Sequence, residues 1–133
     1  SVRDVGWLDA DGLLHLRGRE SRMLVTAGRN VFPEEVETRL MQHPAVAQAS
    51  VLGLPDELRG QCVHAVVQLR ASSHPTVDEL GRWCRLDLEA CKCPRHWWCW
   101  TREWPQTRSG KTDHAAIARL LLADESGGLE SWR

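Results

Sequence analysis

The stretch MLVTAGRNVFPEEVETRLMQ, residues 23–42, contains a tight turn followed directly by the start of a helix. Short runs of strand-forming residues flank the turn, so we predict a β-hairpin in which Gly28 takes a positive φ angle. Pro33 suits the first position of a helix, where its missing N–H is not needed. Val36 and Leu40 then give the helix one buried side. A hairpin that leads into a helix indicates a fold of mixed sheet and helix.

Other apolar and alternating runs predict three further strands and two further helices. The strands cover residues 46–52, 62–69 and 96–101, and the helices run from Thr76 to about Leu88 and from Asp113 onward. An Asp-Gly turn at residues 11–12 predicts another hairpin near the N-terminus. We expect 46–52, which is mostly apolar, to be the central strand and 53–60 to be a loop. These elements predict an α+β fold: a small, mainly antiparallel sheet with three packed helices, plus two β-hairpins near the N-terminus.

The composition excludes several classes of protein. The 133 residues suffice for one domain, and a net charge of −1 offers no basic surface for nucleic acid. No apolar run reaches the roughly 18 residues of a membrane span. The five cysteines, without a secretory signal, predict free thiols in a reducing, cytoplasmic compartment. Only Lys92 and Lys111 among the 17 basic residues are lysine, so both positions merit attention.

Four potential zinc ligands lie close together in the sequence: Cys91, Cys93, His96 and Cys99. Zinc ligands usually come as C-x2-4-C pairs on two separated loops, whereas here all four fall within a single stretch of nine residues, the second half of which is typical of a strand. We therefore expect no metal, and a small zinc protein remains an alternative. His64, on the less apolar side of its strand, is expected to be a packed or surface histidine and not a catalytic base.

The sequence Ser109-Gly110-Lys111-Thr112, just before the last helix, is similar to the end of a phosphate-binding loop. That loop requires a glycine five residues before Gly110, where this chain has Pro105. Proline removes a backbone N–H and fixes φ, which is unsuited to binding phosphate. Lys111 on its glycine turn nevertheless presents a mobile ammonium group. Such a group suits carboxylate or phosphate oxygens that gain negative charge during a reaction.

Five motifs in a fixed order resemble one known superfamily. They are DVGWLDADGLLHLRGR (4–19), AGRNVFPEEVE (27–37), GLPD (53–56), CKCPR (91–95) and WPQTRSGK (104–111). Together they resemble the C-terminal end of adenylate-forming enzymes, the superfamily of acyl-CoA synthetases, peptide-synthetase adenylation domains and luciferases. The resemblance covers roughly residues 4–122.

The resemblance implies a role for particular residues in the first half-reaction, which forms an acyl-adenylate from a carboxylic acid. Lys111 is the implied catalytic residue and bridges the carboxylate and the ribose or α-phosphate oxygens. Asp4 and Arg19 are the implied nucleotide-binding residues, because a carboxylate suits two ribose hydroxyls and a guanidinium suits phosphate. Ser21 stands at the implied hinge between domains.

A second group of residues is implied in binding coenzyme A. The hairpin at Gly28, with Arg29 beside it, is expected to leave room for the pantetheine arm. Lys92 and Arg95 are implied ligands of the coenzyme A phosphates. Their K-x-P-R pattern favours free coenzyme A as the acceptor over a carrier protein.

The resemblance also implies the organisation of the protein. Residues 1–19 are expected to be a remnant of a large N-terminal domain, 18–22 the hinge, 20–123 the mobile lid domain and 124–133 a flexible tail. The whole enzyme is expected to be a ligase that uses ATP, Mg²⁺, coenzyme A and a small carboxylic acid, with fatty acid metabolism as its context. The chain alone is expected to be inactive and to bind no cofactor, because the phosphate loop and acyl pocket belong to the large domain. The alternatives are an adenylation-domain lid that serves a carrier protein, and a non-catalytic protein-binding module.

Overall fold

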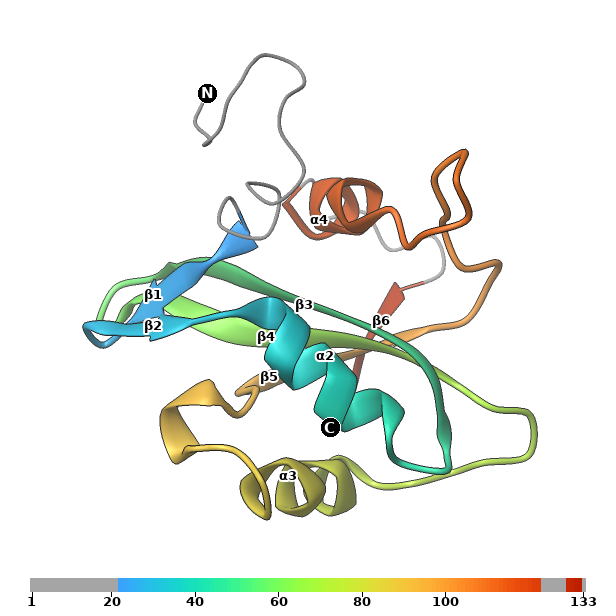
Figure 1. Ribbon diagram of the computed structural model, residues 1–133, viewed down its shortest axis with the longest axis horizontal. Coiled ribbons are helices and arrows are strands. Elements are labelled where there is room, and N and C mark those ends of the chain that lie inside the picture. Colours follow the sequence, from blue (N-terminus) through green and yellow to red (C-terminus); the bar gives the residue numbers. More distant parts are fainter. Residues whose placement is uncertain (1–21, 123–128, 133) are drawn as a thin grey trace.

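The structure, a computed structural model, describes residues 22–122 and 129–132. Figure 1 shows its strands and helices along the chain. In order, they are β1 (Leu24–Thr26), β2 (Arg29–Val31), α2 (Pro33–Met41), β3 (Val46–Asp56), β4 (Gly60–Leu69), α3 (Val77–Arg85), a 3-10 turn (Ala90–Lys92), β5 (His96–Trp100), α4 (His114–Leu122) and β6 (Leu129–Trp132). The hairpin predicted at residues 11–12 lies outside the described residues.

The strands form a two-stranded hairpin, β1–β2, and a four-stranded sheet in the order β3-β4-β5-β6. Within the sheet, β3–β4 and β5–β6 are antiparallel, whereas β4–β5 is parallel. A parallel pair needs a long connection between its strands, and here that connection contains α3. The prediction of an α+β fold with a mainly antiparallel sheet and three helices is confirmed.

The helices cover both faces of the sheet (Figure 1). Alternate residues of β4 point to opposite faces, as the period of a strand requires. Val63, Ala65 and Val67 pack in the core that includes residues of α2 and α3. Val66 faces the other way and packs with Ile117 of α4. The alternation in 62–69 therefore positions two apolar cores, one on each side of the sheet.

The strand at 46–52 is not central, contrary to the prediction, because β3 lies at the end of the hydrogen-bonded order. It is mostly apolar because both of its faces are covered: Ala49 packs toward α2 and α3, and Leu52 packs against the core on the α4 side. The predicted loop at 53–60 is also mostly strand, since pairing continues to Asp56 and Gly60. The turn between them is short because an Asp56 oxygen accepts two backbone N–H groups, at 2.8 and 2.9 Å.

The predicted helix starts are confirmed. α2 begins at Pro33, and α3 follows Thr76, whose hydroxyl accepts the N–H of Glu79 at 3.0 Å. α4 follows Asp113, which accepts the N–H of Ala116 at 3.0 Å. α3 ends at Arg85 and is shorter than predicted.

Part of the predicted flexible tail is a strand. Residues 129–132 form β6, which pairs antiparallel with β5. Without this pairing, β5 would be the edge of the sheet and leave backbone groups unpaired. Trp132 also packs edge-to-face against Trp97, with ring centroids 6.3 Å apart. The glycines at 127–128 suggested a frayed end, but the sheet edge and the tryptophan provide a partner just beyond them.

Candidate functional site

Lys111 ends an exposed turn that the chain closes with its own backbone. The N–H of Thr107 donates to the carbonyl of Lys111 at 2.7 Å, and the N–H of Gly110 donates to the carbonyl of Thr107 at 3.0 Å. Gly110 has a φ of +87°, a conformation that side chains rarely adopt. The predicted turn is therefore present, and its positive φ angle explains why glycine occupies position 110.

The turn is fixed to the body of the domain by Trp104. Its indole is 7% exposed, packs edge-to-face against Trp100 and donates to the hydroxyl of Thr112 at 2.9 Å. The N–H of Asp113 donates to the carbonyl of Pro105 at 3.0 Å on the other side. Lys111 thus extends from a turn whose position is set by the core between the sheet and α4.

The two lysines have different surroundings. Lys92 lies 3.1 Å from a carboxylate oxygen of Glu35, and this hydrogen bond raises the pKa of its ammonium. The side chain of Lys111 is exposed and has no ion-pair partner within residues 22–122 and 129–132. Of the two, Lys111 is available to a ligand from outside this domain.

The residues implied in coenzyme A binding lie at the β1–β2 hairpin and the 3-10 turn. Gly28 has a φ of +78°, and the space that a Cβ would occupy is open. Arg29 pairs with Glu89 at 2.9 Å, directly before the turn that carries Lys92. The structure therefore brings Arg29 and Lys92 to one region, where both cations are held by acidic partners.

Lys111 and Gly28 lie far apart. In Figure 1 the β1–β2 hairpin and the turn before α4 are at opposite ends of the molecule. The side chain of Arg95 is exposed. The backbone N–H of Arg95 donates to the carbonyl of Val63 at 2.9 Å, next to the sheet. Among the described residues, the structure therefore places Lys111 apart from the residues implied in coenzyme A binding.

Asp4, Arg19 and Ser21 lie outside the described residues, but Arg22, at the end of the predicted hinge range, is described. Its guanidinium bonds the Glu37 carboxylate and, at 3.1 Å, the carbonyl of Val51. Glu37 in turn accepts the N–H of Val51 at 2.7 Å. Burial, the largest effect, raises the pKa of Glu37, although Arg22 and the N–H act in the opposite direction. The end of the hinge range is thus fastened to α2 and β3.

His114, at the start of α4, extends this network. Its Nδ1 lies 2.7 Å from the hydroxyl of Ser50 and 3.6 Å from the carboxylate of Glu37. Burial, with a smaller contribution from the nearby Arg22, lowers the pKa of His114 to about 4, although Asp113 acts in the opposite direction. Arg22, Ser50 and His114 line a cavity of about 600 Å³ between β3 and α4. Sequence reasoning missed this network, because only Glu37 carries a motif signal.

We expect the free energy of unfolding to fall as the pH drops from about 6.5 to about 4, in part through His114. The unfolded chain takes up this proton near the ordinary pKa of 6.5, but the folded chain does so only near 4. The charged groups facing the imidazole are Arg22, Glu37 and Asp113. Urea unfolding at pH 7 and pH 5 measures the change. His114→Asn is expected to lose less stability over this interval, and equal losses in both proteins would contradict the expectation.

The four residues of the sequence-predicted zinc alternative do not form a metal-compatible group within the described part of the chain. Cys93 is buried, and its thiol lies 3.6 Å from the carbonyl of Glu89. Cys91 lies 3.8 Å from the Glu89 carboxylate. Both thiols therefore contact Glu89, the residue that precedes the 3-10 turn.

Comparison with known proteins identifies the domain. Residues 35–111 match the model of the AMP-binding enzyme C-terminal domain, which is more than half of the chain. The chain belongs to this family. The resemblance to the acyl-CoA ligases and the adenylate-forming superfamily is confirmed.

Individual relatives agree with the family match. The uncharacterized acyl–CoA ligase YhfT of Bacillus subtilis (strain 168) is 36% identical over 121 residues, which are 91% of this chain and 24% of the relative. A 2-succinylbenzoate–CoA ligase of Geobacillus sp. (strain WCH70) is 33% identical over 126 residues, 95% of this chain and 25% of the relative. The structure of o-succinylbenzoate CoA synthetase from Bacillus subtilis, a double mutant with the product analogue OSB-NCoA, has a TM-score of 0.72 at 26% identity. That match covers 84% of this chain and 21% of that one.

This AMP-binding enzyme C-terminal domain spans about a quarter of the length of the curated relatives it matches. The family match begins at residue 35, within α2, and ends at Lys111. Among the described residues, no helix has the length and hydrophobicity needed to cross a membrane.

Proposed function

We propose that this chain is the mobile C-terminal domain of an acid–thiol ligase. The whole enzyme activates a small carboxylic acid with ATP to an acyl-adenylate and transfers the acyl group to coenzyme A. Membership of the AMP-binding enzyme C-terminal family supports the reaction class. The observation that carries the proposal is the exposed ammonium of Lys111, which has no ion-pair partner among the described residues and extends from a turn anchored by Trp104.

In the first half-reaction, Lys111 contributes a positive charge to the oxygens that become more negative as the adenylate forms. A positioned ammonium stabilises such a transition state because it needs no reorganisation at the moment of reaction. One lysine supplies only part of the groups that are needed to bind ATP and Mg²⁺. Asp4 and Arg19 are proposed to bind the nucleotide, and the large N-terminal domain to supply the rest of the site.

In the second half-reaction, the Gly28 hairpin replaces Lys111 at the active site. Gly28 has open space in place of a side chain, which suits the passage of a pantetheine arm. Arg29, Lys92 and Arg95 are proposed to bind the coenzyme A phosphates. Arg29 and Lys92 must exchange their carboxylate partners, Glu89 and Glu35, for phosphate oxygens.

The separation of Lys111 and Gly28 supports rotation of the domain between the two steps (Figure 1). Both cannot face one active site in a single orientation. We propose residues 18–22, with Ser21, as the pivot, 1–19 as part of the large domain and 20–123 as the lid. The acid that is activated then depends on the large domain, and fatty acids are one class to test.

An assay of the full-length ligase with ATP, Mg²⁺, coenzyme A and a panel of carboxylic acids tests this function. We expect acid-dependent release of AMP together with an acyl-CoA product. Acyl transfer to a carrier protein but not to coenzyme A would replace the proposed acceptor. No acid-dependent AMP would favour a protein-binding module. The 133-residue chain alone is expected to show no carboxylate-dependent pyrophosphate exchange, and its presence would contradict the domain assignment.

A further inference from the structure

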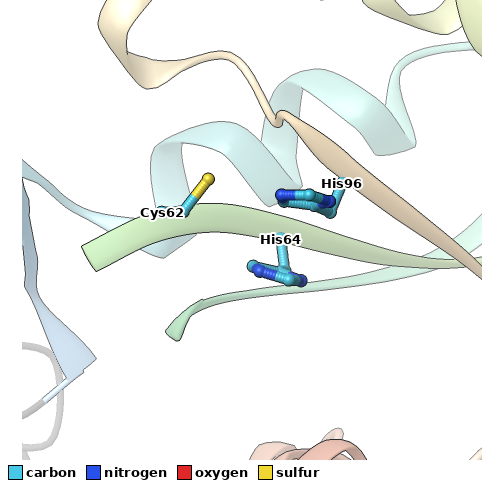
Figure 2. Close-up of side chains that lie close together, drawn as sticks. All are labelled: Cys62, His64 and His96. Carbon is cyan, nitrogen blue, oxygen red and sulfur yellow. The ribbon is translucent and has the colours of Figure 1, made fainter. Parts of the chain in front are cut away.

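Three metal-ligating side chains come together on the sheet, and none of them is among the residues proposed for the ligase reaction. Figure 2 shows Cys62 and His64 on β4 and His96 on the neighbouring β5. Cys62 and His64 are two residues apart on one strand, so they share a face. His96 is the register partner of His64 in the parallel pair. One ligand atom from each residue lies within 4.8 Å of the other two.

We propose that Cys62, His64 and His96 form a binding site for a divalent transition metal ion of the zinc type. One sulfur and two imidazole nitrogens are typical ligands of Zn²⁺ and Co²⁺, whereas Mg²⁺ and Ca²⁺ prefer oxygen. Cys62 is 2% and His64 8% exposed, but His96 is exposed. The site is therefore open on the His96 side, where water can take a fourth position.

The distances are compatible with a bound ion after a small adjustment. Ligand atoms around a tetrahedral zinc lie roughly 3.3 to 3.6 Å apart, given its bond lengths to sulfur and nitrogen. The atoms here must approach by about 1 Å, which rotation of the side chains between rotamers provides. No movement of the strands is required.

The two imidazoles must change their relative orientation. Their rings are stacked, with centroids 4.5 Å apart and planes 20° apart. A metal lies in the plane of each imidazole that binds it, so one ring has to turn. His96 is the ring that can do so, because it is exposed at the start of β5.

His64 carries a lone pair that a metal can use. The indole of Trp98 donates to its Nδ1 at 3.1 Å, so this nitrogen is an acceptor. Burial lowers the pKa of His64 to about 4, with a further contribution from His96, and the ring is neutral at pH 7. A metal at Nδ1 therefore competes with the Trp98 indole and not with a proton.

Cys62 does bind a proton that the metal must displace. Burial raises the pKa of its thiol above the ordinary 9.0; Asp56 acts in the same direction, and Arg95 and Arg59 oppose it. Metal binding at this thiol releases the proton, so the affinity is expected to increase with pH. The ion would also add a link between the side chains of β4 and β5, which pair in parallel and are connected along the chain through α3.

Titration of the reduced 133-residue chain with Co²⁺, followed by competition with Zn²⁺, tests the site. We expect a thiolate-to-cobalt charge-transfer band and a higher melting temperature with Zn²⁺. Loss of groups that only support metal ligands costs about 10- to 100-fold in affinity, so Cys62→Ser and His96→Ala are each expected to cost more than roughly 100-fold. Both changes are mild for the fold, since one is nearly isosteric and the other is exposed.

Matched variants distinguish this site from the cysteines close to His96 in sequence. Cys91→Ser and Cys99→Ser are expected to leave the affinity unchanged. Trp98→Phe removes the competing donor and is expected to increase the affinity by roughly 2- to 10-fold. The proposal is overturned if the wild-type chain shows no thiolate–cobalt band. It is also overturned if Cys62→Ser binds normally while Cys91→Ser or Cys99→Ser does not. Neither outcome tests the proposed ligase reaction, because none of the three residues is assigned a role in it.

Discussion

Lys111→Ala in the full-length ligase is expected to lower the rate of acyl-adenylate formation by at least about 100-fold, the scale of losing one preorganised electrostatic group. Of the two lysines in the described residues, Lys111 is the one without a carboxylate partner. Trp104 and Asp113 hold its turn in place. Removal of the ammonium takes away charge without disturbing packing. Carboxylate-dependent pyrophosphate exchange measures this step directly.

The second half-reaction provides the control. Supplied with preformed acyl-adenylate and coenzyme A, the Lys111→Ala enzyme is expected to form thioester within a few-fold of the wild-type rate. Lys111→Arg is not expected to restore adenylation, because a guanidinium fork has a different shape and donor pattern from an ammonium. Lys92→Ala is the matched lysine control and is expected to spare adenylation. Equal loss in both half-reactions would show that Lys111 serves the fold or coenzyme A binding instead.

Much of the fold could be predicted because its signals are local. The Gly28 turn, the Pro33 helix start and the Thr76 cap each depend on residues within four positions of one another, and all three are present. The turn at Lys111 is of the same kind. Local backbone chemistry decides these features before any long-range packing forms.

The features that the sequence did not predict depend on which distant segments of the chain pack together. An apolar strand such as β3 is buried on both faces whether it is central or covered by helices at an edge, so its run of residues did not reveal its place. β6 pairs with a strand that the sequence could not assign to it. The Cys62–His64–His96 group arises from the parallel register of β4 and β5, and register is not a local property. The motifs located Lys111, but not the network around Glu37.

Glu37→Ala is expected to reduce the free energy of unfolding by about 3 kcal/mol, because it removes the buried carboxylate that pairs with Arg22 and leaves the N–H of Val51 without its acceptor. The carboxylate, with 7% of its side chain exposed, binds the Arg22 guanidinium and accepts the N–H of Val51. Alanine removes both contacts, and the buried N–H of the strand then has no acceptor. Urea unfolding of the 133-residue chain, followed by circular dichroism, measures the change.

Two variants of the same helix show whether burial or charge is responsible for that loss. Glu35→Ala removes a carboxylate that is 46% exposed and pairs with Lys92, so its cost is expected to stay below about 1 kcal/mol. Glu37→Gln keeps an acceptor for Val51 but not the charge opposite Arg22, and should fall between the two. Faster hydrogen exchange at the N–H of Val51 in Glu37→Ala would locate the effect at β3. If Glu37→Ala costs no more than Glu35→Ala, then Glu37 does not fasten the end of the hinge range to the domain.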